Sequence, residues 1–123
     1  MIEGNASDGV YVARSSNAWI AGNTISRNRR HGVYLEKNAQ AEVMANTIDA
    51  NGGHGVFVTH NSGAHLGTAA GARWLDKPNT STVPNTGFGV QCSLGAYLVG
   101  QLGLLNGTAG PKSVTTGCVD TTP

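Results

Sequence analysis

A gapless repeat of 23 residues constrains this chain more than any other feature. Residues 8–12, 31–35 and 54–58 read Asp-Gly-Val-Tyr-Val, His-Gly-Val-Tyr-Leu and His-Gly-Val-Phe-Val, each beginning 23 positions after the one before. Inside the period, the Asn-Thr-Ile of residues 23–25 returns at 46–48. A fixed period of this length is typical of architectures in which each repeat packs on the next.

Within each repeat, apolar residues alternate with others over short runs, such as Val-Tyr-Val at 10–12 and Ala-Trp-Ile at 18–20. Alternation with a period of two predicts short strands, and the Gly, Asn and Ser residues between the runs predict turns. Three such strands in 23 residues leave no room for the helical crossover of a βαβ unit. The remaining solution is a parallel β-solenoid, in which each repeat forms one coil about 4.8 Å from the next.

These repeats resemble those of right-handed parallel β-helix proteins in the pectate-lyase-like superfamily. The resemblance rests on Gly-Val-aromatic-Val, a following apolar residue, and then Asn-Thr-Ile and Asn, and it covers residues 8 to about 68. It implies an all-β, right-handed parallel β-helix. The superfamily includes polysaccharide lyases, glycoside hydrolases, epimerases and phage tailspikes, and also repeats without known activity, so the fold alone does not select a function.

We expect a single β-helix domain over residues 1–123, with about four coils of about 23 residues between about 8 and 106. The register breaks after Leu66, so residues 67–86 are expected to form a loop insertion before the coil resumes at Gly87. The polar residues 107–123 are expected to form a C-terminal cap or tail. A second interpretation makes the chain the C-terminal part of a longer β-helix.

The composition of the chain limits the classes of partner that it is expected to bind. Charged residues make up 12% of the sequence and the net charge is +1, so a nucleic-acid partner held by charge is not expected. No apolar stretch is long enough to span a bilayer, and no membrane partner is expected. The first residues also lack the apolar core of a signal peptide.

The two cysteines form a candidate disulfide. Cys92 occupies the position of Val12, Leu35 and Val58 in the repeat, so its side chain should point inward, and Cys118 lies 26 residues later. A bond between them would fix the tail over the last coil and would indicate an oxidising compartment, hence an extracellular or cell-surface location. The alternative is one buried and one surface thiol, without a role in metal binding.

Equivalent residues of successive coils should stack into ladders, and two outward ladders supply the candidate carbohydrate-binding residues. The first is aromatic and the second is mainly basic; they comprise Tyr11, Tyr34 and Phe57, and Arg14, Lys37 and His60. Aromatic rings beside polar and cationic groups suit sugar rings with hydroxyls or carboxylates, and the rise of a coil, ~4.8 Å, is close to the length of one sugar residue. Alternatively, the loop around Trp74 or a neighbouring subunit covers the aromatic ladder. A third outward set, on a neighbouring strand, comprises Trp19, Glu42 and His65.

No catalytic residue is assigned from the sequence. Asp8, His31 and His54 also stack, but no fourth donor accompanies them, and neither a metal nor another cofactor is expected. The Gly-His-Gly of residues 53–55 resembles that of polygalacturonase-type hydrolases, yet no adjacent pair of aspartates supplies the two carboxylates of glycoside hydrolysis. The groups available to a lyase or epimerase on one face are Arg14, Lys37, His60 and Glu36.

The apolar end of the first coil favours association. Residues 1–7 are too few to form a cap, so the end of the coil is expected to expose Val10, Val12, Ala18, Ile20 and Ile25. We therefore expect a homo-oligomer or end-to-end association. The leading functional hypothesis is a structural, carbohydrate-interacting β-helix segment without established catalysis, with a polysaccharide or oligosaccharide partner. The alternatives are a polysaccharide-active enzyme (lyase, glycoside hydrolase or epimerase) or a fragment of one, and a self-assembly module that resembles tailspike β-helices.

Overall fold

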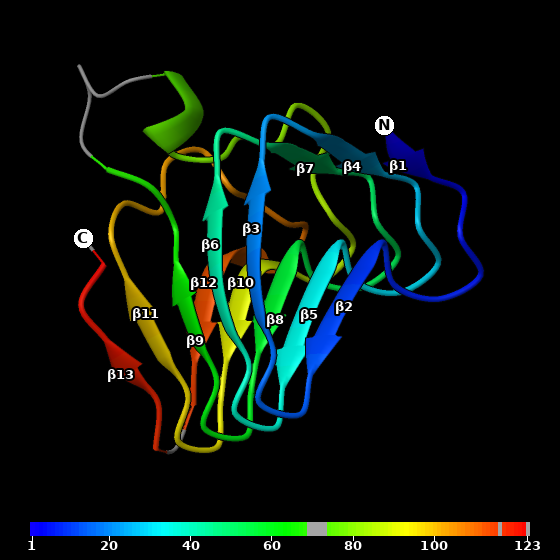
Figure 1. Ribbon diagram of the computed structural model, residues 1–123. Coiled ribbons are helices and arrows are strands. Elements are labelled where there is room, and N and C mark those ends of the chain that lie inside the picture. Colours follow the sequence, from blue (N-terminus) through cyan, green and yellow to red (C-terminus); the bar gives the residue numbers. More distant parts are fainter. Residues whose placement is uncertain (69–73, 116, 123) are drawn as a thin grey trace.

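The chain winds into a stack of coils bounded by three parallel sheets (Figure 1). The structure is a computed structural model and describes residues 1–68, 74–115 and 117–122, without the side chain of Trp74. One short 3-10 helix, η1 (Trp74–Asp76), precedes the fourth coil. The described residues thus form an all-β parallel solenoid of about five turns, which confirms the expected fold class.

Each coil contributes one strand to each large sheet. Sheet A contains β1 (Ile2–Glu3), β4 (Thr24–Ser26) and β7 (Thr47–Asp49). Sheet B contains β2 (Val10–Ala13), β5 (Val33–Glu36), β8 (Val56–Val58), β10 (Phe88–Cys92) and β12 (Gly110–Val114). Sheet C contains β3 (Asn17–Ala21), β6 (Gln40–Met44), β9 (Gly63–His65), β11 (Tyr97–Val99) and β13 (Val119–Asp120).

The register of the sheets reproduces the sequence repeat. Tyr11 pairs with Tyr34 and Tyr34 with Phe57, so the aromatic residues lie side by side on successive strands of sheet B. On sheet C, Trp19 pairs with Glu42 in the same way. Because a slip of one residue would turn every apolar side chain outward, the alternation of the sequence fixes this register.

The core is a column of aliphatic side chains between the sheets. Its fully buried members include Ile25, Leu35, Ile48, Val56 and Leu98. The first coil is better covered than the sequence suggested, because Val12 is only 7% exposed and Ile20 only 6%. The expectation that the end of this coil exposes its apolar residues is therefore wrong for Val12, Ile20 and Ile25, while Val10 and Ala18 are partly exposed.

Buried asparagines link the coils at the turns. The Asn28 amide donates to the Asn51 Oδ1 at 3.0 Å, and the Asn51 amide donates to the Asn85 Oδ1 at 2.9 Å. A parallel ladder contains Asn23, Asn46 and Asn79. Because these side chains also bond to main-chain groups, they satisfy backbone atoms that the turns would otherwise bury without partners.

The asparagine ladders also redefine the insertion. We expected residues 67–86 to form a loop, but Asn79 and Asn85 occupy ladder positions and Thr80 bridges Thr47 and Leu104. Most of the extra residues therefore lie between Leu66 and Asn79, and residues 69–73 of this stretch lie outside the described residues.

The C-terminal residues form a further coil rather than a cap or tail. Strand β12 pairs with β10, and β13 pairs with β11, so residues 107–123 contribute strands to both large sheets. A disulfide joins Cys92 of β10 to Cys118, whose Cα atoms lie 5.8 Å apart, and it ties this coil to the one beneath it.

Candidate functional site

The outer face of sheet B carries six rings in contact with one another, which we call the aromatic face. They are Tyr11, Tyr34 and Phe57 on one line, and His31, His54 and Phe88 on a second. The ring centroids of Tyr34 and Phe57 lie 5.1 Å apart, with an interplanar angle of 9°. His31 contacts the edges of both, at 5.4 and 5.0 Å, so the two lines form one continuous surface.

Stacking decides which ring faces remain available to a ligand. Tyr34 lies between Tyr11, whose ring is tilted by 50°, and Phe57, whose ring stacks at 9°, so other rings cover Tyr34 on both sides. Tyr11 is the first ring of its line and is 54% exposed, whereas Tyr34 and Phe57 are only partly exposed. A sugar ring that stacks on this line therefore has Tyr11 as its main platform.

Glu36 bridges the two tyrosines. The Tyr11 hydroxyl donates to Glu36 Oε1 at 2.6 Å, and the Tyr34 hydroxyl donates to Oε2 at 2.5 Å. These two hydrogen bonds lower the pKa of Glu36 to about 2. Burial, together with the bond to Glu36, raises the pKa of Tyr34 to about 12, and the bond to Glu36 also raises the pKa of Tyr11. Glu36 is thus a fixed carboxylate, a poor proton donor and a weak base.

A hollow of about 530 Å³ lies beside this bridge. Its lining combines two aromatic rings with four polar side chains: Ser7, Asp8, Tyr11, Arg30, Tyr34 and Glu36. The Arg30 guanidinium lies 5.8 Å from the centre of the Tyr34 ring and 3.9 Å from Asp8 Oδ2. Ring surface beside fixed acceptors and a cationic donor suits a small polyhydroxylated ligand.

The structure separates the two predicted ladders. Arg14, Lys37 and His60 have left-handed backbones, with φ of 59°, 57° and 52°, and lie in the turns that follow β2, β5 and β8. Their side chains are exposed and do not line the hollow, although Lys37 Nζ lies 3.5 Å from Glu36 Oε1. Of the six predicted carbohydrate-binding residues, Tyr11 and Tyr34 line the hollow, and Phe57 stacks behind Tyr34.

Sequence reasoning did not place Ser7, Asp8, Arg30 or Glu36 in a common site with the tyrosines. The repeat register contained a signal for Glu36, because it follows Tyr34 by two residues and therefore points to the same side of the strand. Ser7 and Arg30 lie in turns, where the two-residue alternation of a strand does not predict which way a side chain points. The alternative in which the loop around Trp74 covers these rings stays a prediction, because residues 69–73 and the Trp74 side chain lie outside the described ones.

The histidine ladder has a structural role. The backbone N–H of His54 donates to Nδ1 of His31 at 2.9 Å, and that of Phe88 donates to Nδ1 of His54 at 3.0 Å. Burial lowers the pKa of His31 to about 4 and also lowers the pKa of His54. The Nδ1 lone pairs thus join coil to coil. No group of three or more His, Cys, Asp or Glu side chains suited to a metal occurs in the described part of the chain.

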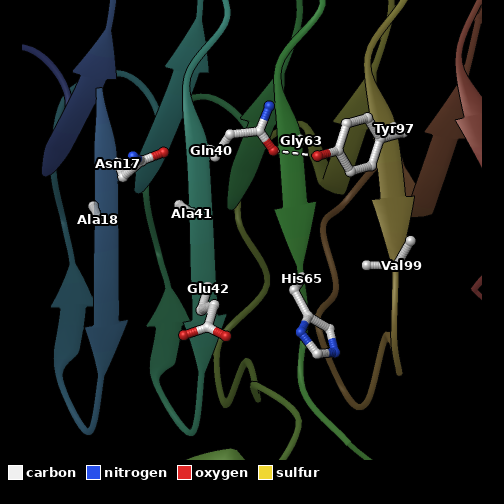
Figure 2. Close-up of a pocket in the computed structure, with 9 residues that line it drawn as sticks. All are labelled: Asn17, Ala18, Gln40, Ala41, Glu42, Gly63, His65, Tyr97 and Val99. Carbon is white, nitrogen blue, oxygen red and sulfur yellow. Dashed lines mark hydrogen bonds between the residues drawn. The ribbon is translucent and has the colours of Figure 1, made fainter. Parts of the chain in front are cut away.

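A second hollow, of about 330 Å³, lies on the outer face of sheet C. Figure 2 shows Asn17, Gln40 and Tyr97 on one side of it, and Glu42, His65 and Val99 on the other. The Tyr97 ring lies across Gly63, where a Cβ would overlap the ring, and the Tyr97 hydroxyl donates to Gln40. This surface contains two members of the third outward set, Glu42 and His65.

The parallel strands, inward aliphatic ladders and asparagine-lined turns define a β-solenoid protein. The family model described as "Right handed beta helix region" matches residues 1–68, and the chain belongs to this family. Neither the curated proteins nor the solved structures contain a match to it. The narrower resemblance to the pectate-lyase-like superfamily is consistent with the fold and remains a prediction. No helix among the described residues is long and apolar enough to cross a membrane.

Proposed function

We propose that this chain is a structural β-helix segment that binds a saccharide through the hollow beside Tyr11. The observation that supports this proposal is the conjunction of an open ring face with fixed polar groups. Tyr11 is 54% exposed, and Asp8, Arg30 and Glu36 line the same hollow. Sugars present apolar C–H faces and hydroxyl edges, so a site of this composition satisfies both.

The charges of the hollow favour a neutral sugar over a strongly anionic one. Asp8 and Glu36 are opposed by Arg30 alone among the lining residues, and the Glu36 carboxylate already accepts two phenolic hydrogen bonds. Each carboxylate oxygen keeps a further lone pair for a sugar hydroxyl. Arg30 is exposed and offers several donors at the rim.

Binding without catalysis is the better-supported form of this proposal. Glycoside hydrolysis needs one carboxylic acid that holds a proton near neutral pH, whereas the phenolic hydrogen bonds lower the pKa of Glu36 to about 2. The Cys92–Cys118 disulfide supports placing the protein in an oxidising compartment, outside the cell or on its surface.

The test is retention on a panel of immobilised neutral and acidic glycans, followed by titration of the best-retained soluble oligosaccharide. Tyr11→Ala removes the ring and should weaken binding tenfold or more, and Tyr11→Phe should retain most of the affinity because it keeps the ring face. Leu104→Ala is the control, since Leu104 is an exposed apolar residue that lies outside the hollow. Equal affinity in the wild type and Tyr11→Ala, or no retention of the wild type, would contradict the proposal.

A further inference from the structure

The outer face of sheet C carries two rows of side chains that run across the strands. One row contains Asn17, Gln40, Gly63 and Tyr97, and the other contains Trp19, Glu42, His65 and Val99. Members of a row are in register on adjacent strands, about 4.8 Å apart, and the rows are separated by two residues along each strand. We call this surface the sheet C face.

The second row has a symmetric order of chemistry. It begins with an apolar ring, continues with an acid and a base, and ends with an aliphatic side chain: Trp19, Glu42, His65 and Val99. When a second copy of the row runs in the reverse direction, each apolar side chain meets an apolar one and each acid meets a histidine. A two-fold axis parallel to the strands, between β6 and β9, would place Trp19 opposite Val99 and Glu42 opposite His65 of a second copy.

We propose that the sheet C face is a self-complementary interface that pairs two copies of this chain with their helix axes antiparallel. A two-fold contact of this kind uses the same patch on both copies, so each favourable pair occurs twice. At its centre, each Glu42 carboxylate would face a His65 imidazole of the other copy, whose ring N–H can donate to it. The arrangement therefore pairs an acceptor with a donor at the centre and apolar side chains at both ends.

The exposed aromatic side chains of the sheet C face support its role as an interface. Trp19 is 63% exposed, which is unusual for the largest apolar side chain, and Tyr97 is 37% exposed. The hollow of about 330 Å³ is bordered by His65, Tyr97 and Val99, on the side of the sheet that the partner's Trp19 would face. Tryptophan anchors beside such hollows are frequent hot spots of binding energy.

The size of the face sets the expected strength. Four strands spaced about 4.8 Å apart, with five residues in β3 and β6 and three in β9 and β11, give a flat footprint of roughly 250 Å² per copy at about 3.3 Å a residue. Interfaces below about 1,200 Å² in total belong to weak or transient complexes. We therefore expect a dissociation constant in the micromolar range or weaker, and a dimer population that changes with concentration.

The pairing leaves the proposed saccharide site open. Sheets B and C cover different sides of the core, because Val12 of β2 and Ile20 of β3 point into the same cluster from separate sheets (Figure 1). Two copies joined through sheet C would therefore present two aromatic faces outward. This geometry adds avidity toward a repeating glycan, but the pairing itself does not depend on the saccharide proposal.

The experiment is sedimentation equilibrium of the full chain over a dilution series that extends to millimolar concentration. The wild type should move from monomer to dimer and no further, since a two-fold contact closes at two copies. Trp19→Ala should raise the dissociation constant at least tenfold. Leu104→Ala is the matched control, because Leu104 is 71% exposed and lies outside the sheet C face.

Exchanging the side chains of Glu42 and His65 for ones of other charge distinguishes this specific interface from nonspecific association. Glu42→Lys removes the acceptor that faces each imidazole, and His65→Glu puts two carboxylates opposite one another, so each variant should weaken the dimer. The double variant, Glu42→Lys with His65→Glu, again places an acid opposite a base and should restore it. A monomer at every concentration, larger species, or a dimer indifferent to Trp19→Ala and to the charge exchange would overturn the proposal. Circular dichroism of each variant verifies that the exposed substitutions leave the fold intact.

Discussion

The imidazoles of His31 and His54 lie parallel, with centroids 5.1 Å apart and an interplanar angle of 1°. The Nδ1 atom of His31 accepts the backbone N–H of His54 at 2.9 Å, so one histidine serves as the main-chain partner of the next. Asp8 occupies the same role one coil earlier, where its Oδ1 accepts the N–H of His31 at 3.0 Å. Neutral imidazoles are therefore part of the coil-to-coil hydrogen bonding.

Acid should destabilise the protein before its carboxylates titrate fully. Burial, with a smaller contribution from His54, lowers the pKa of His31 from 6.5 to about 4. Between about pH 6.5 and pH 4, the unfolded chain therefore binds a proton at His31 that the folded chain does not bind. The contribution of neutral His31 to the free energy of unfolding is complete above about pH 6.5 and declines as the pH falls toward 4. We expect a loss of roughly 1–2 kcal/mol over this window, after allowance for the partly exposed ring.

Urea denaturation at several pH values measures this loss. His31→Asn should flatten the pH dependence, because an amide oxygen replaces Nδ1 as acceptor without taking up a proton. His60→Asn is the control, since His60 is exposed in a turn and should leave the profile unchanged. An unaltered slope in His31→Asn would show that the ladder does not carry the effect.

Asn51 should be among the least replaceable residues of the chain. It is 0% exposed; its Oδ1 accepts from the backbone N–H and the amide of Asn28, and its own amide donates to Ile25 O and Asn85 Oδ1. Asn51→Ala leaves buried main-chain groups unpaired and should cost about 2–5 kcal/mol. Thermal denaturation checks the value, with the exposed Asn106→Ala as control; a loss below about 0.5 kcal/mol would contradict the role.

The fold was predictable because the repeat contains its own register. Equivalent residues such as Val10 and Val33 pair in the structure as the 23-residue spacing requires. The coil after the insertion was harder to delimit, because Asn79 and Asn85 stand 33 and 34 residues after their partners. The last coil was missed because its strands are polar and its inward contact is Cys118 rather than an aliphatic residue.

The candidate site was only partly predictable. Alternation placed Tyr11 and Tyr34 outward, but it gave no information about whether their faces stack on each other or on a ligand. The bridge depends on Glu36 reaching back to Tyr11, across Ala13, its small register partner on the adjacent strand. Such diagonal contacts depend on side-chain length and rotamer, which a repeat pattern does not encode.

Reduction should loosen the C-terminal coil. The Cys92–Cys118 bond closes 26 residues, and a loop of this length corresponds to about 3.5 kcal/mol by the chain-entropy estimate. Alkylation followed by intact-mass analysis should add no label before reduction and two labels after it. The melting temperature should fall on reduction. Two labels without reductant would exclude the bond, and with it the main support for an oxidising compartment.

Glu36 should control the ionisation of Tyr34. Burial and the hydrogen bond to Glu36 raise the pKa of Tyr34 to about 12, so its tyrosinate absorbance should develop late in an alkaline titration. Since the unfolded chain loses this proton near pH 10, stability should decline as the pH rises from about 10 to 12. Glu36→Gln replaces the anionic acceptor with a neutral one and should shift the Tyr34 transition to lower pH. Glu42→Gln on sheet C is the matched control, and identical titrations of both variants would exclude the bridge as the cause.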